Sequence, residues 1–274
     1  MNSMNQLEKE MVEILKRGKD QFGVVSTKAE FEAEGTRIEE LLRLMDISAA
    51  AGLPLTVKIG GCEAIRDLLE AKQIGVKWIV APMVETGYAA SKFLEAKDLI
   101  YSEAEAIDTG FLFNLETITG FNNRQELMDV TKQGRGLNGV VLGRHDFVLS
   151  MGWKAETINS QDTTNYALEI AQLCKSNNKE LVVGGGMSIE SLNGIKQMHE
   201  IRLDRFETRK VIFDAGRAIE SNIQVGLYDA VMFEFNWLRN KQEYYSAISR
   251  EDDKRISAFE KRLVQLKDWI DNPV

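Results

Sequence analysis

The sequence predicts a TIM (β/α)8 barrel with an extended C-terminal helical segment. Short apolar segments alternate with amphipathic segments along a single chain of 274 residues, a length that suits one large barrel. The apolar segments are nearly continuous hydrophobic runs, as expected for parallel strands that are covered on both sides. This alternation favours a barrel, and a doubly wound sheet is the second architecture that it allows.

Seven strands can be predicted from the apolar runs, with helical patterns between them. The predicted strands are Gly23–Thr27, Pro54–Ile59, Trp78–Ala81, Phe111–Leu115, Gly139–Leu142, Leu181–Val183 and Arg205–Phe213. The predicted helices are Arg37–Ala51, Glu63–Gln73, Thr86–Ala96, Asn122–Gln133, Thr164–Ser176, Ile189–Met198 and Asp214–Asn222. Since a closed barrel needs an eighth strand, we place a short and irregular one between Lys97 and Gly110.

Two further helical segments flank this pattern. Asn5–Arg17 is predicted to close the bottom of a barrel that spans residues 1–226. Residues 227–274 form more helix than one barrel needs, and we expect them to pack on a neighbouring subunit; packing on their own barrel is the other possibility. Their side chains that are too apolar to leave in water are Phe233, Phe235, Trp237 and Leu238. Because the chain has only three prolines and no Ser/Gly-rich linker, we predict a single domain.

Composition excludes several classes of protein. Hydrophobic residues make up 44% of the chain and charged residues 28%, which is typical of a folded globular protein. The net charge of −8 disfavours a nucleic-acid partner, which requires a basic surface. No apolar stretch approaches the roughly 20 residues of a membrane span, and the N-terminus lacks the apolar core of a signal peptide. Two cysteines cannot form a disulfide framework, so we expect a cytoplasmic protein without a membrane partner.

Two acidic residues directly follow predicted strands, where the active site of a TIM barrel lies. Glu116 follows Phe111–Leu115, and Asp146 ends the segment GRHD that follows Gly139–Leu142. A carboxylate at such a position is costly unless it is paired, hydrogen-bonded or bound to a metal. Two carboxylates from adjacent strands suit Mg²⁺ or Mn²⁺, and zinc is less suitable without a His or Cys cluster. Capping of helix N-termini is the alternative role.

Other polar residues also follow predicted strands. Lys28, Glu30 and Glu32 lie in the segment KAEFEAEGTR after the first strand, and Lys58 ends the second. His145 lies beside Asp146 and is therefore expected at the mouth of the barrel.

Two glycine runs, Gly60-Gly61 and Gly184–Gly186, link a strand to a helix. Their backbone amides suit an anion, but a tight turn also needs glycine. Both interpretations stay open.

Seven segments of the chain resemble the HpcH/HpaI aldolase and citrate lyase family, in the family's order, from about Gly23 to Phe213. They are KAEFEAEGTR, VKIGGCEA, IVAPMVETGYAASKF, FNLETITGFNN, GVVLGRHDFVLSMG, VVGGGMS and DRFETRKVIF. The resemblance implies a metal-dependent (class II) lyase acting on a 2-oxo acid such as pyruvate, with an aldehyde or acyl partner. It also implies a homo-oligomer built from dimers, in which C-terminal helices pack on a partner barrel.

The resemblance assigns roles to particular residues. Glu116 matches the metal-binding Glu that opens the family's "ET" motif, and Asp146 matches the metal-binding Asp of its Gly-x-x-Asp-(Leu/Phe) motif. Lys58 stands where the family usually has an Arg that stabilises the developing oxyanion, although Lys donates as a point charge rather than a fork.

The substrate site that the resemblance implies lies beside the metal ligands. Backbone amides near Gly143 and Asp146 would hold the carboxylate of the substrate, and we also predict substrate contacts for Arg144, His145 and Gly185.

The residue that serves as the general base stays open, since citrate-lyase-type members of the family also use acidic residues in the region after the first strand. Several aldolases of the family have a His near the end of the first strand, where this chain has Lys28, Glu30 and Glu32. Either a carboxylate or metal-bound water moves the proton, or the reaction differs from simple aldol cleavage. A lyase is the first hypothesis. A condensing enzyme that uses an acyl or enolpyruvyl donor is the second, and a non-catalytic barrel that binds an oxo acid is the third.

Overall fold

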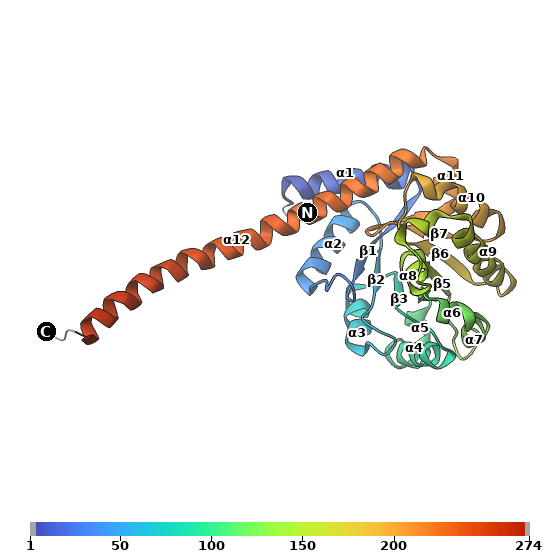
Figure 1. The fold of residues 1–274 in the computed structure, drawn as a ribbon, viewed down its shortest axis with the longest axis horizontal. Helices are drawn as coiled ribbons and strands as arrows, with labels where there is room; N and C mark the ends of the chain where they lie inside the picture. The colour runs from blue at the N-terminus through green and yellow to red at the C-terminus, as the bar shows by residue number, and fades with distance from the viewer. Residues whose placement is uncertain (1–3, 272–274) are drawn as a thin grey trace.

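Eight strands form one closed barrel in chain order (Figure 1), which confirms the predicted TIM-type fold. The computed structural model describes residues 4–271, and their side chains up to residue 268, so 272–274 of the predicted C-terminal segment lie outside it. The strands are β1 (Val24–Glu30), β2 (Leu55–Lys58), β3 (Trp78–Ala81), β4 (Gly110–Leu115), β5 (Gly139–Gly143), β6 (Glu180–Gly184), β7 (Arg205–Glu207) and β8 (Val211–Asp214).

Helices surround the barrel. They are α1 (Gln6–Gln21), α2 (Ile38–Ala50), α3 (Ile65–Ile74), α4 (Gly87–Ile100), α5 (Glu103–Ala106), α6 (Ile118–Asn122), α7 (Arg124–Val130), α8 (Arg144–Ser150), η1 (Ala155–Asn159), α9 (Gln161–Ser176), η2 (Ile189–Ser191), α10 (Leu192–Ile201), α11 (Ala215–Glu220) and α12 (Ile223–Asp271). Of these described helices, none has the length and hydropathy needed to cross a membrane.

Local sequence explains where several helices begin and end. Asn5 caps α1 in a capping box with Glu8, and the Thr86 hydroxyl accepts a hydrogen bond from the Ala89 amide at the start of α4. Ser160 caps α9 in the same way. These side chains satisfy backbone amides that have no partner within the helix. Gly75 ends α3 with a φ of 79°, a conformation that costs glycine little.

The eighth strand was predicted in the wrong place. The chain from Lys97 to Gly110 is mostly helical, because α4 continues to Ile100 and α5 follows. The predicted strand Arg205–Phe213 is instead two short strands, β7 and β8, joined by the turn at residues 208–210. β8 therefore runs antiparallel to both β7 and β1, whereas the other neighbouring strands are parallel.

The inward-facing residues of the strands change from apolar to polar towards their carboxyl ends. Val80, Leu112, Val141 and Val182, on four adjacent strands, pack together in the barrel with Trp78. Because side chains on a strand alternate in direction, the residues two positions later face the same way. On β4, β5 and β6 these are Asn114, Gly143 and Gly184, and all of them line one cavity with Lys58 of β2. Strand periodicity thus places polar groups at the mouth of the barrel.

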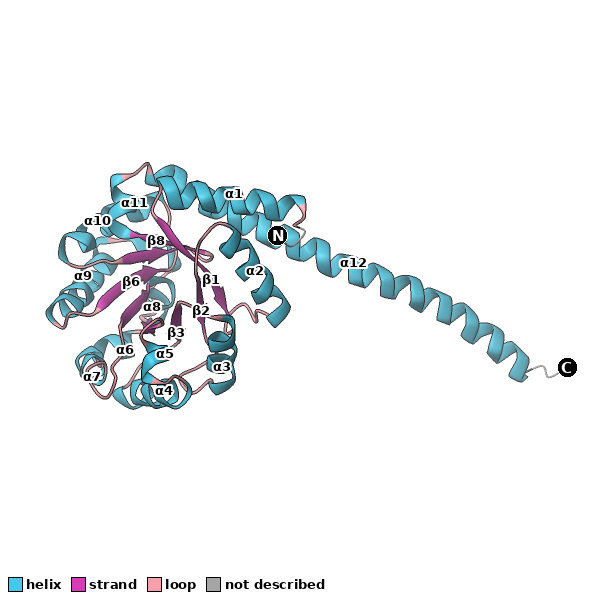
Figure 2. Ribbon diagram, turned by 180° about the vertical axis from the view of Figure 1, so that it is seen from behind, coloured by secondary structure: helices cyan, strands magenta, loops and turns pink. Residues whose placement is uncertain are grey.

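The C-terminal segment is one continuous helix, α12, which runs along the barrel and then projects from it (Figure 2). Its first part packs along α1, with Arg17 paired to Asp229 at 2.7 Å. Phe233 and Trp237, expected to need a partner subunit, are buried within their own chain. Phe235 and Leu238 are half exposed.

Candidate active site

The carboxyl ends of the parallel strands β1 to β7 surround a cavity of about 580 Å³. Nearly every predicted site residue lines it, and Arg144 is the exception. The predicted residues in its wall are Lys28, Glu30, Glu32, Lys58, Glu116, Gly143, His145, Asp146 and Gly185. The structure therefore brings together residues that lie more than 150 positions apart in the sequence.

Glu116 is held in a fixed orientation at the end of β4. It is buried, and its two carboxylate oxygens accept hydrogen bonds from the Met83 amide at 2.9 Å and the Asn114 side-chain amide at 2.6 Å. Burial raises the pKa of Glu116, and the nearby negative charge of Asp146 raises it further, although Lys58 opposes both. The Asn114 carbonyl oxygen is buried and has no hydrogen-bond partner among the described residues.

Asp146 lies in the first turn of α8 and is half-buried. No described residue donates a hydrogen bond to its carboxylate or forms an ion pair with it, yet it lines the same cavity as Glu116. A carboxylate that has no partner and lies near a second carboxylate is a suitable ligand for a cation.

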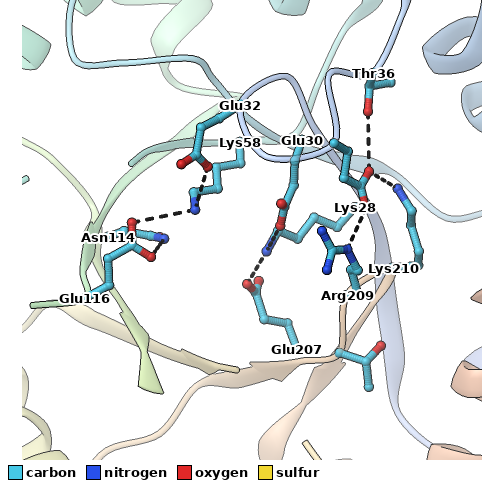
Figure 3. A network of polar contacts seen from close by, with 12 residues as sticks. Lys28, Glu30, Glu32, Thr36, Lys58, Asn114, Glu116, Glu207, Arg209 and Lys210 are labelled. Atoms are coloured by element: carbon cyan, nitrogen blue, oxygen red, sulfur yellow. Dashed lines mark hydrogen bonds and ion pairs between the residues drawn. The ribbon is translucent and has the colours of Figure 1, made fainter. Parts of the chain in front are cut away.

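Lys58 lies between two carboxylates at the end of β2. Its Nζ is 2.9 Å from Glu32 Oε2 and 3.6 Å from Glu116 Oε1 (Figure 3). Burial alone would lower the pKa of Lys58, but Glu116, Glu32 and Glu30 raise it above its ordinary value. The ammonium group therefore stays charged and points into the cavity next to the predicted metal ligand.

Lys28 belongs to β1 rather than to the loop after it, because the strand continues to Glu30. Its Nζ lies 2.9 Å from Glu30 Oε1 and also pairs with Glu207 of β7 (Figure 3). Burial would lower the pKa of Lys28, but the two carboxylates raise it above its ordinary value. A lysine that stays protonated between two acids is not a nucleophile, so we assign Lys28 the role of positioning Glu30 and Glu207.

The loop after β1 is attached to the β7–β8 turn through Glu34. One Glu34 oxygen accepts a hydrogen bond from Arg209 Nε at 3.1 Å, and the other pairs with Lys210. The Lys210 carbonyl also accepts a hydrogen bond from the Lys28 amide at 2.9 Å. These contacts fix the loop that carries Glu32 against the rim of the cavity.

Glycines at the ends of β5 and β6 make room for neighbouring acids. A Cβ on Gly143 would lie 2.6 Å from Glu116 Oε2, and a Cβ on Gly184 would lie 3.0 Å from Glu207. Gly60 does not offer its amide to a ligand, because that amide already donates to Asp67 at 2.7 Å. The turn Gly184–Gly186 has a φ of 82° at Gly185 and 57° at Gly186, which supports the tight-turn interpretation.

Arg144 lies outside the cavity, so its placement does not support the predicted substrate contact. The guanidinium is buried and donates to the Gly184 and Gly185 carbonyls at 3.4 and 2.8 Å, and to Ser191 Oγ at 3.3 Å. No described carboxylate forms an ion pair with it, and burial lowers its pKa to about 10. Arg144 therefore holds the glycine turn against α8, behind the cavity wall.

Gly185→Ala is expected to destabilise the protein more than Gly152→Ala. Both glycines have positive φ, 82° and 73°, which costs an alanine about 1–2 kcal/mol. An added Cβ at Gly185 would also lie 2.6 Å from the His145 amide nitrogen, whereas at Gly152 it would meet open space. Overpacking of this kind typically adds about 1–3 kcal/mol. Urea denaturation of both variants measures the difference, and equal losses would contradict the close packing of this turn on α8.

Sequence reasoning missed several residues of the cavity wall. Glu207 was hidden inside the run Arg205–Phe213, which was taken as one strand, and Arg209 lies in the turn that divides it. Val231 and Glu234 come from α12, in a segment expected to belong to an interface. Asn114, two residues before Glu116, had a detectable signal, because a polar side chain inside an apolar run must face either solvent or a site.

The wall of the cavity carries more negatively charged than positively charged side chains. Three cations line it, Lys28, Lys58 and Arg209. Twice as many carboxylates do so: Glu30, Glu32, Glu116, Asp146, Glu207 and Glu234. A cavity with this excess of negative charge repels an organic acid unless a cation binds first.

The residues present fit a hard divalent cation. Glu116 and Asp146 supply oxygen ligands, the type that Mg²⁺ and Mn²⁺ prefer. No group of three or more His, Cys, Asp or Glu side chains gathers as a metal site within residues 4–271. Any cation held here would therefore keep positions for water or substrate oxygens.

Comparisons with known proteins bear on the fold and the family of this chain. Comparison with curated proteins gives no match. An HpcH/HpaI aldolase/citrate lyase family protein from Burkholderia cenocepacia J2315 has a similar structure, with a TM-score of 0.59 and 13% identity, covering 89% of this chain and 90% of that one. An HpcH/HpaI aldolase from Desulfitobacterium hafniense DCB-2 gives a TM-score of 0.58 and 10% identity, covering 74% and 83%. At these identities the two structures support the fold alone. The sequence model of HpcH/HpaI aldolase/citrate lyase matches residues 25–183, more than half of the chain, so this protein belongs to the HpcH/HpaI aldolase/citrate lyase family.

Proposed function

We propose that this protein is a metal-dependent lyase that forms or breaks a carbon–carbon bond next to a 2-oxo acid such as pyruvate. Family membership supports an aldolase-like lyase in general. The observation that carries the finer proposal is the convergence of Glu116, Asp146 and Lys58 on one cavity with excess negative charge. An anionic substrate can enter such a cavity when a divalent cation balances the carboxylates.

Glu116 and Asp146 would hold the cation, with Mg²⁺ or Mn²⁺ the best match to their oxygen ligands. When bound, the cation would supply Lewis-acid stabilisation of negative charge on the keto oxygen of the substrate. One of these two metal ligands, Glu116, is already oriented, because the Met83 amide and the Asn114 side chain donate hydrogen bonds to its carboxylate. Such surrounding hydrogen bonds orient metal ligands and tune their affinity.

Lys58 is the residue that we assign to stabilise the developing oxyanion. Its ammonium lies 3.6 Å from Glu116 Oε1 and lines the cavity, so it can donate to an oxygen held beside that carboxylate. The ion pair with Glu32 positions the ammonium group before substrate arrives, and charge that is oriented in advance avoids a reorganisation cost during the reaction.

Glu32 is the residue that we assign to move the substrate proton. Both candidates pair with a buried lysine at 2.9 Å, Glu30 with Lys28 and Glu32 with Lys58. Burial would raise the pKa of Glu30, but Lys28 and Lys58 lower it. Glu32 is the more exposed of the two carboxylates, 27% against 10% of the side chain, and shares the cavity with Lys58. A base must reach the substrate before its pKa matters, and this geometry favours Glu32.

Exchange of the pyruvate methyl protons with deuterated water tests the proposal without knowledge of the second substrate. We expect the enzyme with Mg²⁺ or Mn²⁺ to catalyse this exchange, observed by proton NMR, and expect none after chelation with EDTA. Lactate is the control, because it lacks the keto group that acidifies the neighbouring protons. Binding of pyruvate without metal-dependent exchange would contradict the proposal and favour a barrel that only binds oxo acids.

A further inference from the structure

Glu207 is a buried carboxylate of the catalytic cavity to which the proposed function gives no role. It ends β7, it is 5% exposed, and it lines the same cavity as Glu116 and Asp146. One of its oxygens, Oε1, pairs with the Lys28 ammonium. Among the described residues, none donates a hydrogen bond to its other oxygen, Oε2. A buried carboxylate that faces a cavity with an unused oxygen is suited to contact with a substrate.

A strip of bare backbone lies between Glu116 and Glu207 at the mouth of the barrel. Gly143 and Gly184 are register partners on β5 and β6, the two strands that separate β4 from β7. A Cβ on Gly143 would lie 2.6 Å from Glu116 Oε2, and a Cβ on Gly184 would lie 3.0 Å from Glu207 Oε1. No side chain of β5 or β6 therefore stands between the two carboxylates at this level. A substrate bound beside Glu116 can extend over the glycines towards Glu207.

Glu30, the other carboxylate that pairs with Lys28, does not face such a strip. Its register partner on β2 is Lys58, whose side chain lines the cavity and pairs with Glu32. Side chains thus occupy the neighbouring position on that side of the barrel. Of the two partners of Lys28, only Glu207 has open backbone between itself and the proposed metal ligands.

Lys28 holds the two carboxylates in a group that has one negative charge in excess. Its Nζ lies 2.9 Å from Glu30 Oε1 and also pairs with Glu207, and Figure 3 shows it between the two. None of the three side chains is more than 10% exposed, so water screens their charges weakly. Two carboxylates and one ammonium can take up one proton without leaving a buried charge unpaired. Glu30 would keep Lys28 paired while Glu207 is protonated.

We propose that Glu207 is a catalytic base and acid of the lyase reaction: it takes the hydroxyl proton when the carbon–carbon bond breaks and returns it when the bond forms. This inference rests on the proposed function and adds a second proton-transfer group to it. Glu32 pairs with Lys58, and Glu207 pairs with Lys28. Two separate pairs are thus available for the two protons of the reaction.

In the direction of cleavage the two protons move at different atoms. The Glu207 carboxylate takes the proton from the hydroxyl on the carbon that becomes the aldehyde. The carbon–oxygen bond becomes a carbonyl, and the electron pair of the carbon–carbon bond passes to the pyruvate part, which leaves as an enolate. The enolate carbon then takes a proton from the acid form of Glu32. Exchange with water returns both carboxyl groups to their starting states.

Two reactions of the same enzyme separate the role of Glu207 from the proposed function. Exchange of the pyruvate methyl protons requires proton transfer at carbon alone, whereas condensation of pyruvate with an aldehyde also requires a proton at oxygen. Glycolaldehyde and glyceraldehyde are suitable probes, because both are small and carry no charge that the negative cavity would repel. Proton NMR follows both reactions, and we expect the wild type with Mn²⁺ or Mg²⁺ to catalyse exchange and to condense pyruvate with at least one of the two aldehydes.

Glu207→Gln is expected to slow condensation by about 10²–10⁴-fold, the usual contribution of a general base or acid, and to slow exchange far less. The amide keeps the size of the side chain but cannot take up the proton. Glu207→Asp is the second variant, in case the first does not fold. It keeps the negative charge beside Lys28 but withdraws the carboxylate by one carbon, so the same difference between the two reactions is expected.

Glu30→Gln is the matched comparison, because it removes the other carboxylate from the same buried lysine. A loss that came only from disturbing Lys28 would be equal in both variants, whereas we expect Glu207→Gln to slow condensation at least about 10-fold more. Equal losses, or a parallel loss of exchange and condensation in the Glu207 variants, would overturn the proposal. So would a wild type that exchanges protons but condenses pyruvate with neither aldehyde. A wild type without exchange would contradict the proposed function itself, and this inference with it.

Discussion

Asp146→Asn is expected to weaken binding of Mn²⁺ by at least about 100-fold, the upper end of the cost of losing a residue that only supports a ligand. Asp146 is one of only two carboxylates that we assign to the metal. Its carboxylate receives no hydrogen bond or ion pair from the described residues, so the neutral amide should leave the barrel folded. Glu116→Gln should lose affinity to a similar extent.

Isothermal titration calorimetry with Mn²⁺ measures this effect, and thermal unfolding checks the fold. Asp162→Asn is a suitable control, because Asp162 is an exposed acid in the first turn of α9, outside the cavity wall. Unchanged affinity in both the Asp146 and Glu116 variants would show that the metal assignment is wrong.

Lys58→Met is expected to lower kcat by about 10²–10³-fold, the typical cost of losing one oxyanion donor. The same change should leave Mn²⁺ affinity equal or higher, because it removes a positive charge 3.6 Å from Glu116. Opposite effects on metal binding and turnover therefore distinguish Lys58 from the ligands.

Steady-state kinetics of the exchange reaction at saturating Mn²⁺ measures this loss, and Lys58→Arg serves as the conservative control. Arg keeps the charge but has a different donor geometry, so partial activity is expected. Near-normal turnover of Lys58→Met would mean that the oxyanion is stabilised by another group.

Hydrophobic periodicity favoured the barrel and located most of the cavity-wall residues that were named from the sequence, whereas the roles of those residues came from the family resemblance. Glu116, Asp146 and Lys58 could be located from the ends of the predicted strands. A long apolar run such as Phe111–Leu115 shows where a buried strand stops and where the polar mouth of the barrel begins. The period of two then determines which side chains face inward, as it does for Lys28 and Glu30 within β1.

One error missed a local signal, and another arose where local pattern and tertiary context differ. The run Arg205–Phe213 was taken as one strand, although four consecutive polar residues at 207–210 interrupt its apolar pattern where the turn divides it. Arg144 lies between two cavity residues, but a helix begins at that position and its side chain faces the opposite way. Only the packing of α8 on the glycine turn decides that direction.

Phe233 and Trp237 show a related difficulty. Their sequence pattern established that they must be covered, and both are buried within their own chain, where Lys210 Nζ lies 5.8 Å from the centroid of the Trp237 ring. Periodicity shows that a helix has an apolar face, but it does not show which surface packs on that face. That surface depends on where the chain places the helix relative to the barrel.

The antiparallel direction of β8 sets the polarity of the rest of the chain. In a barrel with eight parallel strands the last strand ends at the catalytic mouth, and the following helix descends to the opposite end. Here β8 ends beside the starts of β1 and β7, since Phe213 pairs with Val24 and Asp214 with Arg205. The next long helix, α12, therefore runs from this end of the barrel towards the catalytic mouth. It passes the rim of the mouth, where Val231 and Glu234 form part of the cavity wall. One three-residue turn, at residues 208–210, thus decides from which end of the barrel α12 projects. With one reversal fewer, the same 49-residue helix would descend from the mouth and project from the opposite end.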